Sequence, residues 1–113
     1  MTESEMSYNK NILKLVSYVG FAKKARNIYF GADKVLETNK KGVIIVSRSI
    51  SDGTLNKLNN HASKTNSEVM IIHEKIMEQI VQSDRIKVFL ILDANLEKAV
   101  MTGLKTLEDT ILE

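Results

Sequence analysis

The residues whose types and spacing favour a chemical function are cations that surround one glycine in the first third of the chain. The cations are Lys23, Lys24, Arg26 and Lys34, and the glycine is Gly31. A glycine has no side chain, so the backbone beside Gly31 can approach a ligand closely. The helix predicted to begin there presents free N–H groups and the positive end of its dipole to anions. Cations around such a helix start favour contact with phosphate groups.

These residues also have purely structural interpretations. A turn explains Gly31, and from the local sequence alone that is the better interpretation. The cations at residues 23–26 suit the C-terminal end of a helix dipole whether or not a ligand is present. Arg48 and Ser49 leave the first central strand and are expected near Gly31, where they would add to a basic surface.

The distribution of charge is uneven along the chain. The net charge is only +2, but residues 1–57 hold ten Lys and Arg against five Asp and Glu, whereas residues 58–113 hold six against nine. A one-sided basic surface is what contact with an anionic partner requires, because neutralised phosphates drive non-specific nucleic-acid affinity. A solvated surface with chance asymmetry accounts for the charges equally well.

Other residue types predict no catalytic or metal site. The chain has no cysteine, which excludes disulfides, zinc–cysteine sites and thiol catalysis. His61 and His73 stand alone and are interpreted as surface or capping residues. Asp93 follows a strand and opens a helix, so an N-cap explains it. No glycine-rich nucleotide motif or nucleophile-elbow motif is present. We therefore expect neither enzyme activity nor a cofactor.

Hydrophobic periodicity divides the 113 residues into alternating helices and strands. Helices are expected over residues 9–25, 32–41, 52–64, 74–81 and 94–107, and strands over residues 28–30, 43–46, 69–72 and 86–92. Residues 1–8 are polar and predict a flexible tail, which leaves residues 9–113 as one domain. Gly42 is well placed to stop the second helix.

The apolar residues predict how these elements pack. The expected inward stripe of the first helix consists of Ile12, Leu13, Val16, Val19 and Ala22. Phe21 and Phe89 are expected in the core, with Phe30 inward and Tyr29 more exposed. The continuous β-branched run at residues 43–46 is typical of a strand covered on both faces. The pattern predicts an α/β fold, a three-layer α/β/α sandwich.

Residues 13–49 resemble a known family. The runs GFAKKAR, FGADKVLE and KKGVIIVS, in this order, are similar to the L-seven-Ae / L-thirty-e superfamily of ribosomal proteins, above all its bacterial YlxQ-type members. The order of elements matches over roughly residues 10–102. The resemblance implies a small mixed four-stranded sheet between helices. It also implies binding to sharply bent RNA, typically a kink-turn, often within a ribosome or another ribonucleoprotein particle.

The resemblance assigns the RNA contacts to the start of the second helix and the loops beside it. The expected contact residues are Lys23, Lys24, Arg26, Asn27, Gly31, Ala32, Asp33, Lys34, Glu37, Arg48, Ser49 and His73. At three of these positions kink-turn readers usually carry Asn, Glu and Lys, where this chain has Asp33, Lys34 and Glu37. Asp33 accepts hydrogen bonds but cannot donate them as Asn does. These differences favour a general RNA surface over base-specific kink-turn readout.

Two other functions fit the same sequence. One is a protein-interaction module, because the reversed charges at Lys34 and Glu37 are what the evolutionary loss of RNA binding would produce. The other is a stand-alone RNA-recognition domain like those that precede the catalytic domain of some RNA methyltransferases. No stretch approaches the roughly 20 apolar residues of a membrane span, and residues 1–9 lack a signal-peptide pattern. We expect a cytoplasmic monomer whose partner is structured RNA.

Overall fold

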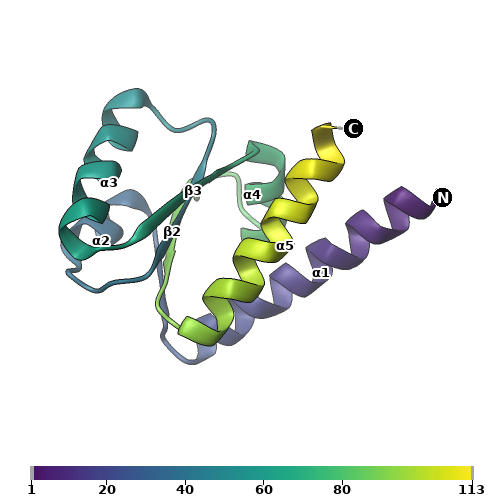
Figure 1. Ribbon diagram of the computed structural model, residues 1–113, viewed down its shortest axis with the longest axis horizontal. Helices are drawn as coiled ribbons and strands as arrows, with labels where there is room; N and C mark the ends of the chain where they lie inside the picture. Colours follow the sequence, from purple (N-terminus) through teal and green to yellow (C-terminus); the bar gives the residue numbers. More distant parts are fainter. Residues whose placement is uncertain (1, 113) are drawn as a thin grey trace.

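The computed structural model of the protein describes residues 2–112. Helices and strands alternate along this range (Figure 1). The helices are α1 (Glu3–Lys24), α2 (Ala32–Glu37), α3 (Asp52–Thr65), α4 (Glu74–Val81) and α5 (Ala94–Leu112). The strands are β1 (Ile28–Phe30), β2 (Val43–Ser47), β3 (Glu68–Ile72) and β4 (Val88–Ile91).

The four strands form one mixed sheet in the order β1-β4-β2-β3. β4 pairs antiparallel with both β1 and β2, whereas β2 and β3 are parallel. β1 and β3 are therefore the edge strands, and β4 and β2 lie in the middle. The α/β fold and the mixed four-stranded sheet that the sequence predicted are confirmed.

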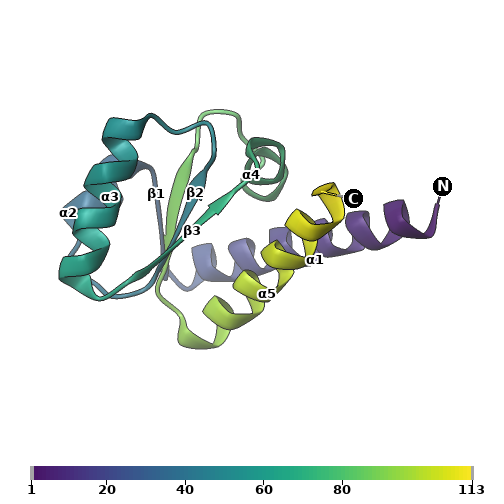
Figure 2. The same cartoon turned by 45° about the horizontal axis from the view of Figure 1, so that its top comes forward.

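The helices cover the sheet in two layers (Figure 1). α1, α4 and α5 pack on one face around Phe89, and α2 and α3 pack on the other face around Leu58. Figure 2 shows α1 and α5 side by side in the first layer, where the two helices contact each other. The β2 and β4 side chains alternate between the layers, and all of β2 and β4 is buried as the β-branched run predicted.

The first helix begins earlier than expected. α1 starts at Glu3, where the Thr2 hydroxyl accepts a hydrogen bond from the Glu5 amide at 3.2 Å. Residues 3–8 therefore belong to α1, and the predicted tail through residue 8 is wrong. The Tyr8 hydroxyl donates to Gln79 Oε1 at 2.7 Å, which fixes this part of α1 against α4.

The buried stripe of α1 is also rotated from the prediction. Leu15, Val19 and Ala22 are buried, whereas Leu13 is 67% exposed and Phe21 is 60% exposed. The placement of Leu13 and Phe21 in the core is therefore wrong. Apolar residues surround this helix on several sides, so periodicity alone did not identify the stripe that faces α4 and α5.

The second helix is shorter than expected. α2 ends at Glu37, and Thr38 takes an extended backbone with φ −94° and ψ 142°. Thr38 and Asn39 are weak helix formers, which explains the early end. Gly42 directly precedes β2 and does not cap α2, so its predicted function as a helix stop is wrong.

The start of α5 gives a pH prediction. Burial raises the pKa of Glu97, the carboxylates of Glu68 and Asp93 raise it further, and Lys41 opposes them. The folded state thus binds this proton more tightly than the unfolded chain, so stability is lost as pH rises through the folded-state pKa. We expect Glu97→Gln to melt at a higher temperature than the parent at pH 7.

The low-pH comparison is the internal control for this prediction. Both proteins are neutral at this position at about pH 3, so their melting temperatures should coincide there. Thermal denaturation followed by circular dichroism at both pH values measures the difference. Equal melting at pH 7, or a difference that persists in acid, would contradict the assignment to Glu97 ionisation.

Candidate nucleic-acid interface

Several predicted contact residues meet at one end of the sheet, which we call the Gly31 end. β1, β2 and β3 finish there and β4 begins there. Three backbone hydrogen bonds of 2.8 Å hold the ends together, from Gly31 to Val88, from Ser47 to Lys87 and from Arg48 to Ile72. This end gathers Gly31, Ala32, Asp33, Lys34, Arg48, Ser49 and His73, as the sequence predicted.

Lys24, Arg26 and Asn27 lie at the opposite end of β1. The Asn27 carbonyl accepts a hydrogen bond from the Leu92 amide at 2.9 Å, where β4 has ended. Three residues of extended chain lie between Asn27 and Gly31, which spans about 13 Å at the rise of a strand. The expected basic rim around Gly31 is therefore not formed by Lys24, Arg26 or Asn27.

Arg26 has an unusual backbone at that opposite end. Its φ is 58°, in the left-handed region, and its amide donates to the Lys23 carbonyl while the Asn27 amide donates to the Ala22 carbonyl. This is the usual way to end a helix, but glycine is the residue that fits the position best. An arginine there costs about 1 kcal/mol relative to glycine.

Gly31 itself has a conformational reason to be glycine. Its φ of 94° lies in a region that other residues rarely adopt. Its carbonyl accepts the first hydrogen bond of α2 from Val35 at 3.1 Å. A Cβ built on Gly31 would meet no atom within 4 Å, so the space beside it is open. The turn interpretation explains why glycine is required, and the open space leaves the backbone accessible to a ligand.

Cations flank the edge strand β1 on both faces. Phe30 points toward α1 and Tyr29 toward α2. Lys23 Nζ lies 5.7 Å from the Phe30 ring centroid, and Lys40 Nζ lies 5.7 Å from the Tyr29 ring centroid. The predicted opposite orientation of the two rings is confirmed, but both are half-buried, so the predicted difference in exposure is not seen.

A shallow depression of about 510 Å³ lies beside Tyr29. Its lining residues are Tyr29, Lys34, Glu37 and Thr38. His61 fixes this region, because its Nε2 lies 2.7 Å from the Thr38 carbonyl oxygen. Glu37 is a carboxylate in this lining and offsets part of the lysine charge. We call Lys23, Tyr29, Gly31, Lys34 and Lys40 together the β1–α2 surface.

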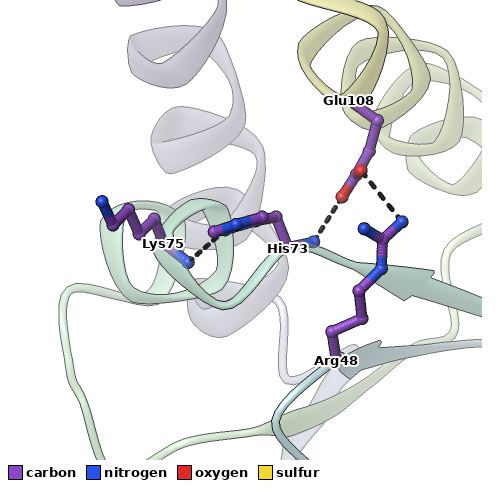
Figure 3. Close-up of polar contacts among 4 residues, drawn as sticks. All are labelled: Arg48, His73, Lys75 and Glu108. Carbon is purple, nitrogen blue, oxygen red and sulfur yellow. Dashed lines mark hydrogen bonds and ion pairs between the residues drawn. The ribbon is translucent and has the colours of Figure 1, made fainter. Parts of the chain in front are cut away.

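Arg48 and Ser49 have partners within the fold. The Ser49 amide donates to the hydroxyl of buried Ser47, and the two hydroxyl oxygens lie 2.8 Å apart. Arg48 forms an ion pair with Glu108, with 3.4 Å between its Nη2 and Glu108 Oε2 (Figure 3). The Arg48 side chain is 56% exposed, so its remaining donors are open to solvent.

His73 caps α4, as the sequence allowed. Its Nδ1 accepts a hydrogen bond from the Lys75 amide at 3.1 Å, and its own amide donates to Glu108 Oε1 (Figure 3). Glu108 is only 8% exposed and joins α5 to the ends of β2 and β3. Burial raises the pKa of Tyr8, and the Glu108 carboxylate raises it further, so Tyr8 remains a hydrogen-bond donor.

Carboxylates border the Gly31 end on its α4 side. A depression of about 280 Å³ is lined there by Ser47, Ser49, Glu74, Met77, Glu78, Asp84, Ile86 and Lys87. Three of these eight side chains are acidic and one is basic, which disfavours a phosphate. An anion is therefore better accommodated on the β1–α2 surface, which shares Gly31 and Lys34 with this end.

Sequence reasoning missed two residues of this region. Lys40 was expected in the second helix, yet it follows α2 and reaches the Tyr29 ring. Glu108 was missed because the last helix was expected to end near residue 107. It lies four residues after buried Leu104, on the inward stripe of α5, and that spacing was the available signal.

Comparison with known proteins bears on the fold. No protein-family model matches the chain, and no curated protein matches it in sequence. The solved structure of a protein of unknown function from Bacillus halodurans C is similar, with a TM-score of 0.67 and 18% sequence identity. The match covers 81% of this chain and 97% of the other. At this identity the likeness is one of fold alone.

Two further findings apply to residues 2–112. No helix in that range is long and apolar enough to cross a membrane. The same residues include no group of three or more His, Asp or Glu side chains placed to hold a metal ion.

Proposed function

We propose that this chain is a cytoplasmic RNA-binding module of the L-seven-Ae / L-thirty-e type that contacts structured RNA through the β1–α2 surface. The proposal makes it a binding protein without catalytic activity of its own. Its partner would be a ribosomal or other non-coding RNA with a sharp bend. Support comes from the sequence resemblance, the mixed sheet between two helical layers and the open backbone at Gly31.

The observation that carries the proposal is the placement of lysines on both faces of an edge strand. Lys23 and Lys40 lie over the two rings of β1, and Lys34 lines the depression between β1 and α2. Phosphates that follow the β1 edge would meet cations on either side. Tyr29, half-buried in the depression, offers a ring edge or face to a base, and such contacts are typical of RNA recognition.

Charge reversal at this surface tests the proposal. The double variant Lys34→Glu and Lys40→Glu should weaken binding to a kink-turn RNA hairpin at least tenfold, because two phosphate contacts become repulsive. The matched control is Lys57→Glu with Lys64→Glu, two exposed lysines of α3 that change net charge by the same amount. Fluorescence anisotropy of labelled RNA measures both affinities.

The control decides how the result is interpreted. Weakening confined to the Lys34 and Lys40 variant supports the β1–α2 surface. Equal weakening in both variants would mean that RNA responds to net charge, and an unchanged affinity in the first would remove these lysines from the interface.

A protein-interaction function has one observation in its favour. Met6, Leu13 and Phe21 are each more than half exposed on α1, and large apolar side chains in such positions are common at protein contacts. They are not among the residues of the β1–α2 surface, so this function does not explain the lysines there.

A further inference from the structure

A groove runs between α1 and α5 on the outer surface of the helical layer. It has a volume of about 450 Å³ and is lined by Asn11, Lys14, Leu15, Tyr18, Asn95, Lys98, Ala99, Thr102, Gly103 and Thr106. The two helices approach closely at Gly103, where an added Cβ would lie 3.2 Å from Leu15 Cδ2. The groove follows α5 from Asn95 to Thr106, about 17 Å at the rise of a helix.

The chemistry of the lining favours an anionic ligand that also forms hydrogen bonds. Lys14 stands on the α1 wall and Lys98 on the α5 wall, and both are exposed. No carboxylate lines the groove. Asn11 and Asn95 supply amides that both donate and accept hydrogen bonds, one from each wall.

The cations that the Gly31 end does not hold lie at the C-terminal end of α1, outside the groove lining. Residues 6–26 contain five Lys and Arg and no Asp or Glu. The backbone beside Arg26 meets the segment that leads into α5, through the hydrogen bond between Leu92 and Asn27. Lys14 and Lys98 therefore supply the positive charge of the groove itself.

The groove lining favours a nucleic-acid strand over an acidic peptide. A peptide binds a groove by placing large apolar anchors in pockets. Leu15 in the lining is fully buried, and the large exposed apolar residues of α1 are not part of the lining. Tyr18 is half-buried in the lining, and an aromatic ring beside lysines and amides suits stacked bases and phosphates.

We propose that the α1–α5 groove binds a short single-stranded segment of RNA, with Lys14 and Lys98 on phosphates and Tyr18 against a base. The proposal extends the RNA-binding function above and rests on it for the identity of the ligand. The groove and the β1–α2 surface are separate sites. The β1–α2 surface would hold the bent RNA, and the groove would hold a single strand that extends from it.

The test uses a labelled octauridylate, whose binding to the full chain is followed by fluorescence anisotropy. We expect Lys14→Glu with Lys98→Glu to weaken binding at least tenfold, because two facing cations are reversed. Tyr18→Leu keeps the volume filled and should weaken binding about tenfold through lost stacking.

Two comparisons separate this inference from the proposed function. The groove variants should bind a kink-turn hairpin without single-stranded ends as the parent does, and the Lys34 and Lys40 variant should bind octauridylate as the parent does. Octauridylate that binds while the hairpin does not would refute the proposed function and retain the groove.

Three outcomes would overturn the groove proposal. The first is a parent protein that binds the hairpin but not octauridylate. The second is octauridylate binding that the groove variants leave unchanged. The third is binding of an octaglutamate peptide at least as tight as that of octauridylate, because it would make the groove a site for acidic proteins.

Discussion

Replacement of Gly42 by alanine should destabilise the protein by about 3 kcal/mol or more, which is at the upper end of overpacking effects. A Cβ at this position would lie 2.2 Å from the Ile91 carbonyl oxygen and 2.9 Å from Leu90 Cδ1. The obstacle is backbone of the neighbouring strand β4, which cannot rotate away as a side chain can. Either β2 moves or its pairing with β4 is lost.

The surroundings of Gly42 leave little room for such a movement. The Gly42 amide donates to Ser67 Oγ at 3.0 Å, and its carbonyl accepts from the Glu68 amide at 3.2 Å. These contacts hold the start of β2 against β3 on one side while β4 closes the other. Denaturant unfolding of the alanine variant measures the loss.

Gly20→Ala is the matched control. Gly20 lies within α1, and a Cβ there would meet no atom within 4 Å. Alanine is the better helix former, so this variant should gain up to about 1 kcal/mol. A Gly42 variant as stable as the parent would show that β2 and β4 are not packed as described.

Glu108→Ala should destabilise the protein by about 2 kcal/mol, the usual loss when a buried group is left without a charged hydrogen-bond partner. The Glu108 carboxylate accepts from the His73 amide and from Arg48, and it is 8% exposed. Without it the N–H at the junction of β3 and α4 has no acceptor, and the C-terminal part of α5 loses its polar tie to the sheet.

Three further variants separate the contributions of the His73 hydrogen bond and the Arg48 ion pair to this loss of stability. Glu108→Gln keeps an amide oxygen for the His73 N–H and should lose less than half as much stability. Arg48→Ala should cost less than about 1 kcal/mol, because Arg48 is 56% exposed and solvent screens its charge. Asp109→Ala, a neighbouring exposed carboxylate, is the control. If urea unfolding shows that Glu108→Gln loses as much stability as Glu108→Ala, the hydrogen-bond explanation is contradicted.

Local sequence signals predicted most of the fold. The bounds of β1 and α4 were both predicted, because those signals act within a few residues. Gly42 was misassigned because its requirement comes from the Ile91 carbonyl, almost fifty residues away in the chain. Phe21 was misassigned because an apolar residue on α1 gives no sign of which side the other helices cover.

The candidate site was predicted in part for a similar reason. Gly31, Arg48 and His73 directly follow β1, β2 and β3, and these three strands run in the same direction. The structure therefore brings the three residues to one end of the sheet. Arg26 precedes β1 and Gly31 follows it, so the strand itself separates two groups that are close in sequence. Lys40 became part of the β1–α2 surface only because α2 ends early.

The central claim is that this protein binds structured RNA, and one titration tests it most directly. A kink-turn hairpin and a straight duplex of the same length and composition are titrated at about 50 mM and about 200 mM salt. We predict tighter binding of the bent RNA at both concentrations, with affinities for both RNAs that fall as salt rises. Absence of binding to either RNA at the lower salt would contradict the claim.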